Sequence, residues 1–159
     1  MSALAELKQK TAITLKEIFN DVRLTDDGEG FEIPFDDFFI RIVFTEDTDE
    51  ESIKWCNENG FPLTSIRMSA IAVDRIKPSS EFYEYLAVEL PNSVNSQVYV
   101  GRQPNSEEYV YCSFWNRIAG DSADPNEIKF SVITLMWDAQ NGGKNLIEKF
   151  GAKWIWSKE

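Results

Sequence analysis

The chain has 159 residues, a length that fits one domain with a sizeable core, and 43% of them are hydrophobic, which excludes a disordered chain. Its net charge is −11, from 27 acidic and 16 basic residues, and no stretch gathers Lys or Arg into a stripe that could follow a phosphate backbone, so we expect no nucleic-acid partner. The absence of histidine removes Ser-His and Cys-His nucleophile pairs and the usual zinc sites.

The two cysteines, Cys56 and Cys112, are far apart in the sequence and form no CxxC pair. The amino-terminal stretch carries charges throughout, unlike a secretory signal, and no window approaches the length of a membrane span. We therefore expect a cytoplasmic protein with two reduced thiols and no membrane partner.

A first amphipathic helix is predicted at the start of the chain. Its apolar positions recur at three- and four-residue steps: Leu4, Leu7, Thr11, Leu15, Ile18 and Val22. Asn20-Asp21 and then the turn-forming run TDDGEG, residues 25–30, end this helix.

Two strands separated by a corner are predicted over residues 31–44, FEIPFDDFFIRIVF. The apolar alternation shifts by one position at Asp36-Asp37, and a phase shift in a strand requires a turn or a bulge. An active-site carboxylate pair would need one carboxyl in an apolar pocket, whereas turns recruit Asp for hydrogen bonds to their own backbone. We therefore interpret the two aspartates as a corner.

The acidic run TEDTDEES, residues 45–52, predicts the start of a second helix. Thr48 and Glu51 have the spacing of a capping box, and Asn59-Gly60 followed by Pro62 closes the helix. The run lacks the alternating oxygen ligands and the central glycine of a calcium loop, so we expect no metal site here.

In residues 63–76 apolar side chains occur at even and at odd positions, so both faces of a strand formed there would be apolar. This pattern predicts a central strand covered on both faces. The segment from Lys77 to Glu81 predicts a helix start, with Phe82, Leu86 and Leu90 on one face and Pro91 at its end.

A hairpin is predicted over residues 97–118. On its second strand Val110, Cys112 and Phe114 share one face, while the other face carries Tyr109, Tyr111, Ser113 and Trp115. Because both faces of this strand are rich in large apolar groups, either helices cover both faces within the monomer or one face contacts a partner protein.

The segment Asp124-Pro125-Asn126-Glu127 predicts the start of a long last helix. Its predicted buried stripe is Ile128, Val132, Leu135, Met136 and Ala139, and Asn141-Gly142-Gly143 is predicted to interrupt it before Leu146, Ile147 and Phe150. The chain then ends in AKWIWSKE, where Trp154 and Trp156 share a parity and are predicted to dock onto a sheet or a neighbouring subunit.

Together these elements predict one domain over residues 1–159. Its class is α+β: a mainly antiparallel sheet on which an N-terminal helix, a middle helix and a long C-terminal helix pack. No nucleotide-binding, hydrolase or metalloprotease motif is present, so we expect neither a catalytic site nor a cofactor.

The element order resembles the type III secretion chaperone-like fold, in particular the YbjN-like bacterial proteins. The residues that carry the resemblance are the phase-shifted segment 31–44, the segment EFYEYLAVELPNSVNSQVYVG and the closing DPNEIKFSVITLMWDAQNGGKNLIEKFGAK. The resemblance implies a small acidic cytoplasmic homodimer that binds another polypeptide through apolar patches and catalyses no reaction.

Three hypotheses follow. The first is a non-catalytic protein-binding module, chaperone-like or regulatory, that binds its partner through Tyr109, Tyr111, Trp115, Trp154 and Trp156. The second is an immunity or antitoxin-like inhibitor whose carboxylates at 46–51 and 26–29 cover a basic partner. The third is an enzyme that uses Asp36, Asp37 or Asp74.

Overall fold

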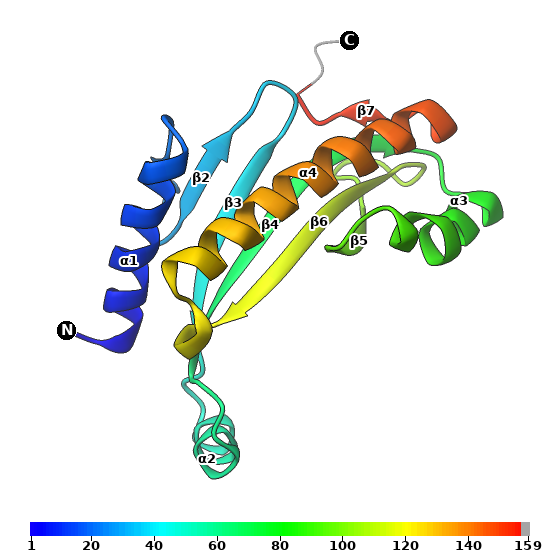
Figure 1. Cartoon of the computed structure of the whole chain (residues 1–159). Coiled ribbons are helices and arrows are strands. Elements are labelled where there is room, and N and C mark those ends of the chain that lie inside the picture. Colours follow the sequence, from blue (N-terminus) through cyan, green and yellow to red (C-terminus); the bar gives the residue numbers. More distant parts are fainter. Residues whose placement is uncertain (157–159) are drawn as a thin grey trace. The chain divides into compact units, whose positions relative to one another are not determined.

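The computed structural model describes residues 1–156 and contains, within them, four α-helices and seven strands (Figure 1). The helices are α1 (Ala3–Ile18), α2 (Glu50–Asn59), α3 (Ser80–Glu84) and α4 (Pro125–Phe150). The strands are β1 (Arg23–Leu24), β2 (Phe31–Pro34), β3 (Phe39–Glu46), β4 (Thr64–Ile76), β5 (Gln97–Arg102), β6 (Val110–Ala119) and β7 (Lys153–Trp154). The strand order is β1-β2-β3-β4-β6-β5, and β7 pairs with β4. The α+β class with a central β4 is confirmed.

The chain divides into two compact units. Unit 1 comprises residues 1–33, 41–68 and 117–132, and unit 2 comprises residues 34–40, 69–116 and the chain from Ile133 onward. Strands β2, β3, β4 and β6 and helix α4 contribute residues to both units.

Unit 1 contains α1, which begins where the Ser2 side chain accepts a hydrogen bond from the backbone N–H of Ala5. Leu7 and Leu15 on this helix are buried, and the hydroxyl of Thr11 is buried too but donates to the carbonyl of Leu7. Most of the other apolar core residues of the unit lie on the strands and on the first turns of α4: Ile33, Ile42, Ile66, Met68, Ile118, Ile128 and Val132. These burials remove apolar surface from water and stabilise the unit.

The N-terminus of α2 is one residue away from the predicted position. Asp49, and not Thr48, is the N-cap, and its carboxylate accepts a hydrogen bond from the backbone N–H of Ser52 at 2.8 Å. Asp is as good an N-cap as Thr, and the choice between adjacent candidates depends on where the chain leaves β3. The predicted end is confirmed: Gly60 adopts a left-handed conformation, which glycine tolerates without steric cost.

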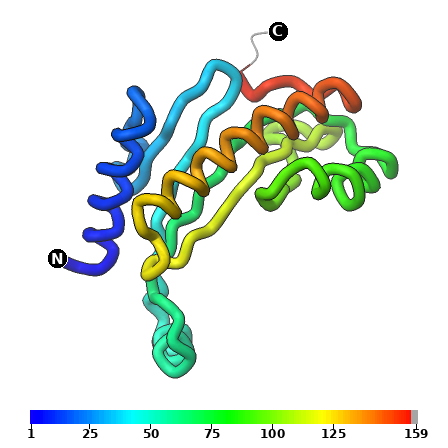
Figure 2. The backbone as a smooth tube through the Cα atoms, viewed as in Figure 1, coloured from blue at the N-terminus to red at the C-terminus, as the bar shows by residue number. Residues whose placement is uncertain are grey.

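In unit 2 the predicted corner at Asp36-Asp37 is confirmed. The backbone N–H of Phe35 donates to the carbonyl of Phe38 at 2.8 Å, which closes the turn, and both aspartates are exposed. Figure 2 shows the chain reversing there between β2 and β3. The phase shift in the apolar alternation therefore marks a corner.

Helix α3 differs from its prediction because it widens after one turn. A π-helical turn, Tyr85–Glu89, and a 3-10 turn, Leu90–Asn92, continue it, and Pro91 lies inside the latter. Tyr85 is buried in the wider turn, as are Phe82 and Leu90, whereas Leu86, which the four-residue spacing placed in the core, is only half-buried. A π turn changes which residues share a face, so regular helical spacing fails here.

Helix α4 is continuous, and the predicted interruption at Asn141-Gly142-Gly143 is wrong. A Cβ atom at Gly142 would lie 2.5 Å from the ring of Phe114, so glycine lets the helix approach β6 closely. The predicted start is confirmed: the Asp124 carboxylate accepts from the backbone N–H of Glu127 at 2.9 Å. Glycine costs the helix some conformational entropy, but tertiary packing offsets that cost.

None of the helices formed by residues 1–156 is long and apolar enough to cross a membrane.

Candidate functional site

The hairpin β5-β6 carries the first set of predicted site residues, and all of it lies in unit 2. Its strands pair antiparallel, with Gln97 opposite Trp115 and Gly101 opposite Tyr111. Val110, Cys112 and Phe114 are buried, as the predicted parity requires.

The opposite face of β6 is only partly covered. Tyr109 is 37% exposed, and Tyr111 and Trp115 are half-buried. Tyr99 of β5 is 52% exposed, and its ring centroid lies 6.1 Å from that of Tyr111. We call Tyr99, Tyr109, Tyr111 and Trp115 the hairpin aromatic face.

Tyr111 is held in place by the strand opposite it. A Cβ atom at Gly101 would lie 2.4 Å from the Tyr111 ring, so the ring covers the glycine backbone. Burial, and to a smaller extent the neighbouring Tyr99, raise the pKa of the Tyr111 phenol, so this hydroxyl is a neutral hydrogen-bond donor at physiological pH. The face presents aromatic surface with hydroxyl groups and no charge.

The two C-terminal tryptophans dock onto the sheet and its corner. Trp154 of β7 pairs with Val73 of β4, and its ring stacks on Phe38 with centroids 6.1 Å apart. Trp156 stacks on Phe39 at 5.2 Å and is 44% exposed. The two rings therefore pack on adjacent residues of the chain, Phe38 and Phe39.

The three aspartates of the enzyme hypothesis lie in different surroundings. Asp36 and Asp37 are in the exposed corner, whereas Asp74 on β4 is buried, with its Oδ1 3.6 Å from Nε of Arg75. Among the residues that the structure describes, no group forms a hydrogen bond with this Oδ1 atom. Burial raises the pKa of Asp74, and Arg75 opposes that shift. Within residues 1–156 no group of acidic or cysteine side chains has the arrangement of a metal site.

The acidic segments have local structural roles. In segment 26–29 the Asp27 carboxylate accepts from the Thr25 hydroxyl at 2.6 Å and from the backbone N–H of Glu29 at 2.9 Å, while the Glu29 side chain pairs with Lys8. The Thr25 hydrogen bond is the main cause that lowers the pKa of Asp27. Hydrogen bonds to Ser52 likewise lower the pKa of Asp49. These carboxylates hold a turn and a helix end.

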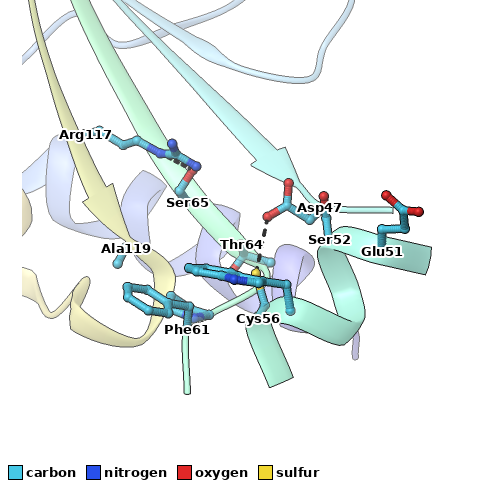
Figure 3. Close-up of a pocket in the computed structure, with 11 residues that line it drawn as sticks. Asp47, Glu51, Ser52, Cys56, Phe61, Thr64, Ser65, Arg117 and Ala119 are labelled. Carbon is cyan, nitrogen blue, oxygen red and sulfur yellow. Dashed lines mark hydrogen bonds between the residues drawn. The ribbon is translucent and has the colours of Figure 1, made fainter. Parts of the chain in front are cut away.

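A cleft in unit 1, of about 780 Å³, was not predicted from the sequence (Figure 3). One wall of the cleft is α2 and the loop that follows it. The other is formed by the first residues of β4 and the last residues of β6. Trp55 and Phe61 line it as a stacked pair, 5.1 Å apart with an interplanar angle of 23°, and each is 56% exposed. The sequence signal for the cleft was the pair of large aromatics that flank Asn59-Gly60.

Polar groups surround this aromatic pair. The Arg117 Nε donates to the Ser65 hydroxyl at 3.0 Å, and the Ser65 hydroxyl is 2.6 Å from that of Thr45. The Cys56 thiol donates to Asp47 at 3.8 Å, and burial together with Asp47 raises the pKa of this thiol. A thiol with a raised pKa is a poor nucleophile.

No protein-family model matches the sequence, and no curated protein matches it. Among solved structures, the chain is similar to the crystal structure of the Yersinia pestis type III secretion chaperone SycH in complex with a stable fragment of YscM2. The match covers 87% of this chain and 98% of that chain, with 9% sequence identity and a TM-score of 0.48.

Proposed function

We propose that this protein is a non-catalytic protein-binding module, chaperone-like or regulatory, of the kind found among YbjN-like and type III secretion chaperone-like proteins. In this proposal it is a cytoplasmic homodimer that needs no cofactor. Its binding residues are Tyr109, Tyr111 and Trp115 of the hairpin, with Trp154 and Trp156 beside the corner.

One observation carries the proposal: the hairpin has a buried face and a second face of large aromatic side chains that are only partly covered. Tyrosine and tryptophan are enriched at protein interfaces because their rings bury a large area with few rotatable bonds. A surface of this type binds extended polypeptide by apolar contact and by hydrogen bonds from the tyrosine hydroxyls.

The test combines solution mass with client binding. We would measure light scattering over a dilution series, together with suppression of aggregation of a chemically unfolded client protein, for the wild type and for Trp115→Ala. The matched control is Trp137→Ala, which removes a 58% exposed tryptophan from α4 in the same unit.

We expect Trp115→Ala to weaken client binding or dimerisation by about fivefold or more, as truncation of an interface aromatic does. Trp137→Ala should change neither by more than about twofold. A chain that is monomeric at every concentration would remove the homodimer, and client binding that is equal in the two variants would remove the hairpin aromatic face.

The acidic inhibitor is the second candidate function, favoured by the net charge of −11 and by Asp47 and Glu51 at the edge of the unit 1 cleft. An inhibitor that uses carboxylates should associate with its basic partner more slowly as salt rises, whereas apolar binding by the hairpin should depend weakly on salt. Measuring the association rate between 50 and 500 mM salt distinguishes the two.

A further inference from the structure

The cleft in unit 1 has the features of a receptor for a cationic side chain. The Trp55 and Phe61 rings are stacked nearly parallel and more than half exposed. In a monomeric protein, exposed aromatic rings that lie together in a concave site mark a binding surface more often than isolated exposed residues do. The ring faces carry partial negative charge, which attracts cations.

Two carboxylates on the α2 side of the cleft add to this attraction. Asp47 is half-buried just before α2, and Glu51 is exposed in its first turn. Figure 3 shows both on one side of Ser65, with Arg117 approaching Ser65 from the other. The site therefore offers negative charge beside an aromatic platform, and a guanidinium on the opposite side.

Arg117 adds a second requirement for a bound molecule, which is a hydrogen-bond acceptor. Its Nε donates to the Ser65 hydroxyl, which orients the guanidinium over that residue. A guanidinium carries five N–H donors, and these match backbone carbonyls and carboxylates. A bound segment that presents a cation to the aromatic rings and carbonyl oxygens to Arg117 therefore satisfies both sides of the cleft.

We propose that this cleft binds a lysine or arginine side chain presented by an extended segment of a partner protein. The cation lies against the Trp55 and Phe61 rings, Asp47 and Glu51 neutralise it, and Arg117 donates to the main-chain carbonyls of the same segment. The volume of about 780 Å³ accommodates a few residues of extended chain and lies within the range of ordinary ligand sites. The inference rests on the proposed protein-binding function and names a second site for it, apart from the hairpin aromatic face.

The probes are capped nonapeptides of glycine and serine that carry one central residue: lysine, arginine, glutamate or the uncharged lysine isostere norleucine. Binding is followed by NMR through the indole N–H of Trp55, which is identified by its loss in Trp55→Ala. We expect the lysine and arginine peptides to shift this signal, with affinities at least about tenfold above those of the norleucine and glutamate peptides.

Two variants test the site, each with a matched control. Asp47→Asn/Glu51→Gln should lower the affinity for the lysine peptide about fivefold or more, whereas Glu107→Gln/Glu108→Gln, the same change in net charge in the turn between β5 and β6, should leave it within twofold. Trp55→Ala should abolish binding that Trp137→Ala retains. For these two the readout is isothermal titration calorimetry, because one variant lacks the indole probe.

Several results would overturn the proposal. Equal affinity for the lysine and norleucine peptides would make the cleft a plain apolar pocket. An equal loss in both charge variants would mean that only the overall charge of the protein acts. A Trp55 signal that shifts when the protein alone is diluted would identify a second copy as the occupant, and no shift with any peptide would mean that the cleft binds none of them.

The same measurements separate this inference from the proposed function. If Trp115→Ala loses client binding while its Trp55 signal still responds to the lysine peptide, both stand. If the lysine peptide fails while client binding still depends on Trp115, only the cleft inference falls. If Trp115→Ala leaves client binding unchanged while the Trp55 signal still responds to the lysine peptide, only the hairpin aromatic face falls.

Discussion

A methyl group at Gly143 would lie 2.5 Å from ring carbon Cζ3 of Trp154 and 3.4 Å from Val73. The middle of α4 and the C-terminal strand β7 therefore pack at a distance that only glycine permits. The same Trp154 ring stacks on Phe38, so it lies between the helix and the corner of the sheet. This contact adds to the two backbone pairings that join β7 to β4.

We expect Gly143→Ala to destabilise the protein in spite of the better helix propensity of alanine. Alanine gains about 1 kcal/mol over glycine inside a helix, but overpacking a core costs about 1–3 kcal/mol, so the net loss should be about 1 kcal/mol. Urea denaturation measures the difference. Asn141→Ala, at an exposed position of the same helix, is the control and should be neutral or slightly stabilising. A stabilised Gly143→Ala would show that Trp154 moves aside at little cost.

A second prediction concerns Asp138, a buried carboxylate on α4. Its Oδ2 accepts from the backbone N–H of Ser96 at 2.7 Å and from that of Asn95 at 2.9 Å, which ties the loop before β5 to the helix. Asp138→Ala should lower the free energy of unfolding by about 2 kcal/mol, because the buried N–H of Ser96 loses its partner. Asp138→Asn keeps an acceptor oxygen and should lose clearly less. Equal losses in both variants would mean that the charge, and not the hydrogen bonds, matters.

Asp74 should make stability depend on pH. Burial raises its pKa in the folded state above the unfolded value of 3.8, so the folded protein binds this proton more tightly. The stability that protonated Asp74 contributes is therefore full below pH 3.8 and is lost as pH rises through the folded pKa. Asp74→Asn, which cannot ionise, should stabilise the protein at pH 7, and this gain should shrink toward pH 4. Denaturation midpoints of both proteins over that range test the sign, and a gain that grows toward low pH would contradict it.

Cys112 should be chemically silent in the folded protein. It is fully buried, and burial raises the pKa of its thiol to about 12, so only about one molecule in ten thousand is ionised at pH 8. In a Cys56→Ser background, we expect an aromatic disulfide reagent to label Cys112 only at the rate of unfolding. Labelling without denaturant at a rate proportional to reagent concentration would show that β6 opens locally and would weaken the assignment of its inner face to the core.

Much of the fold could be predicted because its signals are local. The corner at Asp36-Asp37 follows from a phase shift within seven residues on either side, and the ends of α2 and α4 follow from capping groups and turn residues next to them. The hairpin β5-β6 and its buried parity also follow from alternation along one strand. Each of these features depends on hydrogen bonds or sterics between residues near each other in the chain.

The binding surfaces were predicted less well. Tyr109, Tyr111 and Trp115 were found because alternation identifies the second face of a strand, although their role stays a prediction. The unit 1 cleft was missed because Trp55, Phe61 and Arg117 come from separate elements, and nothing in the sequence indicates that β6 ends beside α2.

The sequence by itself determined the α+β class, the order of the elements, the corner and the absence of histidine chemistry, because composition and local periodicity carry that information. Only the tertiary structure decided that Gly142 and Gly143 continue a helix instead of breaking it. The rings of Phe114 and Trp154 occupy the space that Cβ atoms at these two positions would need, so glycine serves close packing here. The tertiary structure also decided that Trp55 and Phe61 form an exposed stack beside carboxylates, because a site made of residues from several elements exists only once those elements have packed.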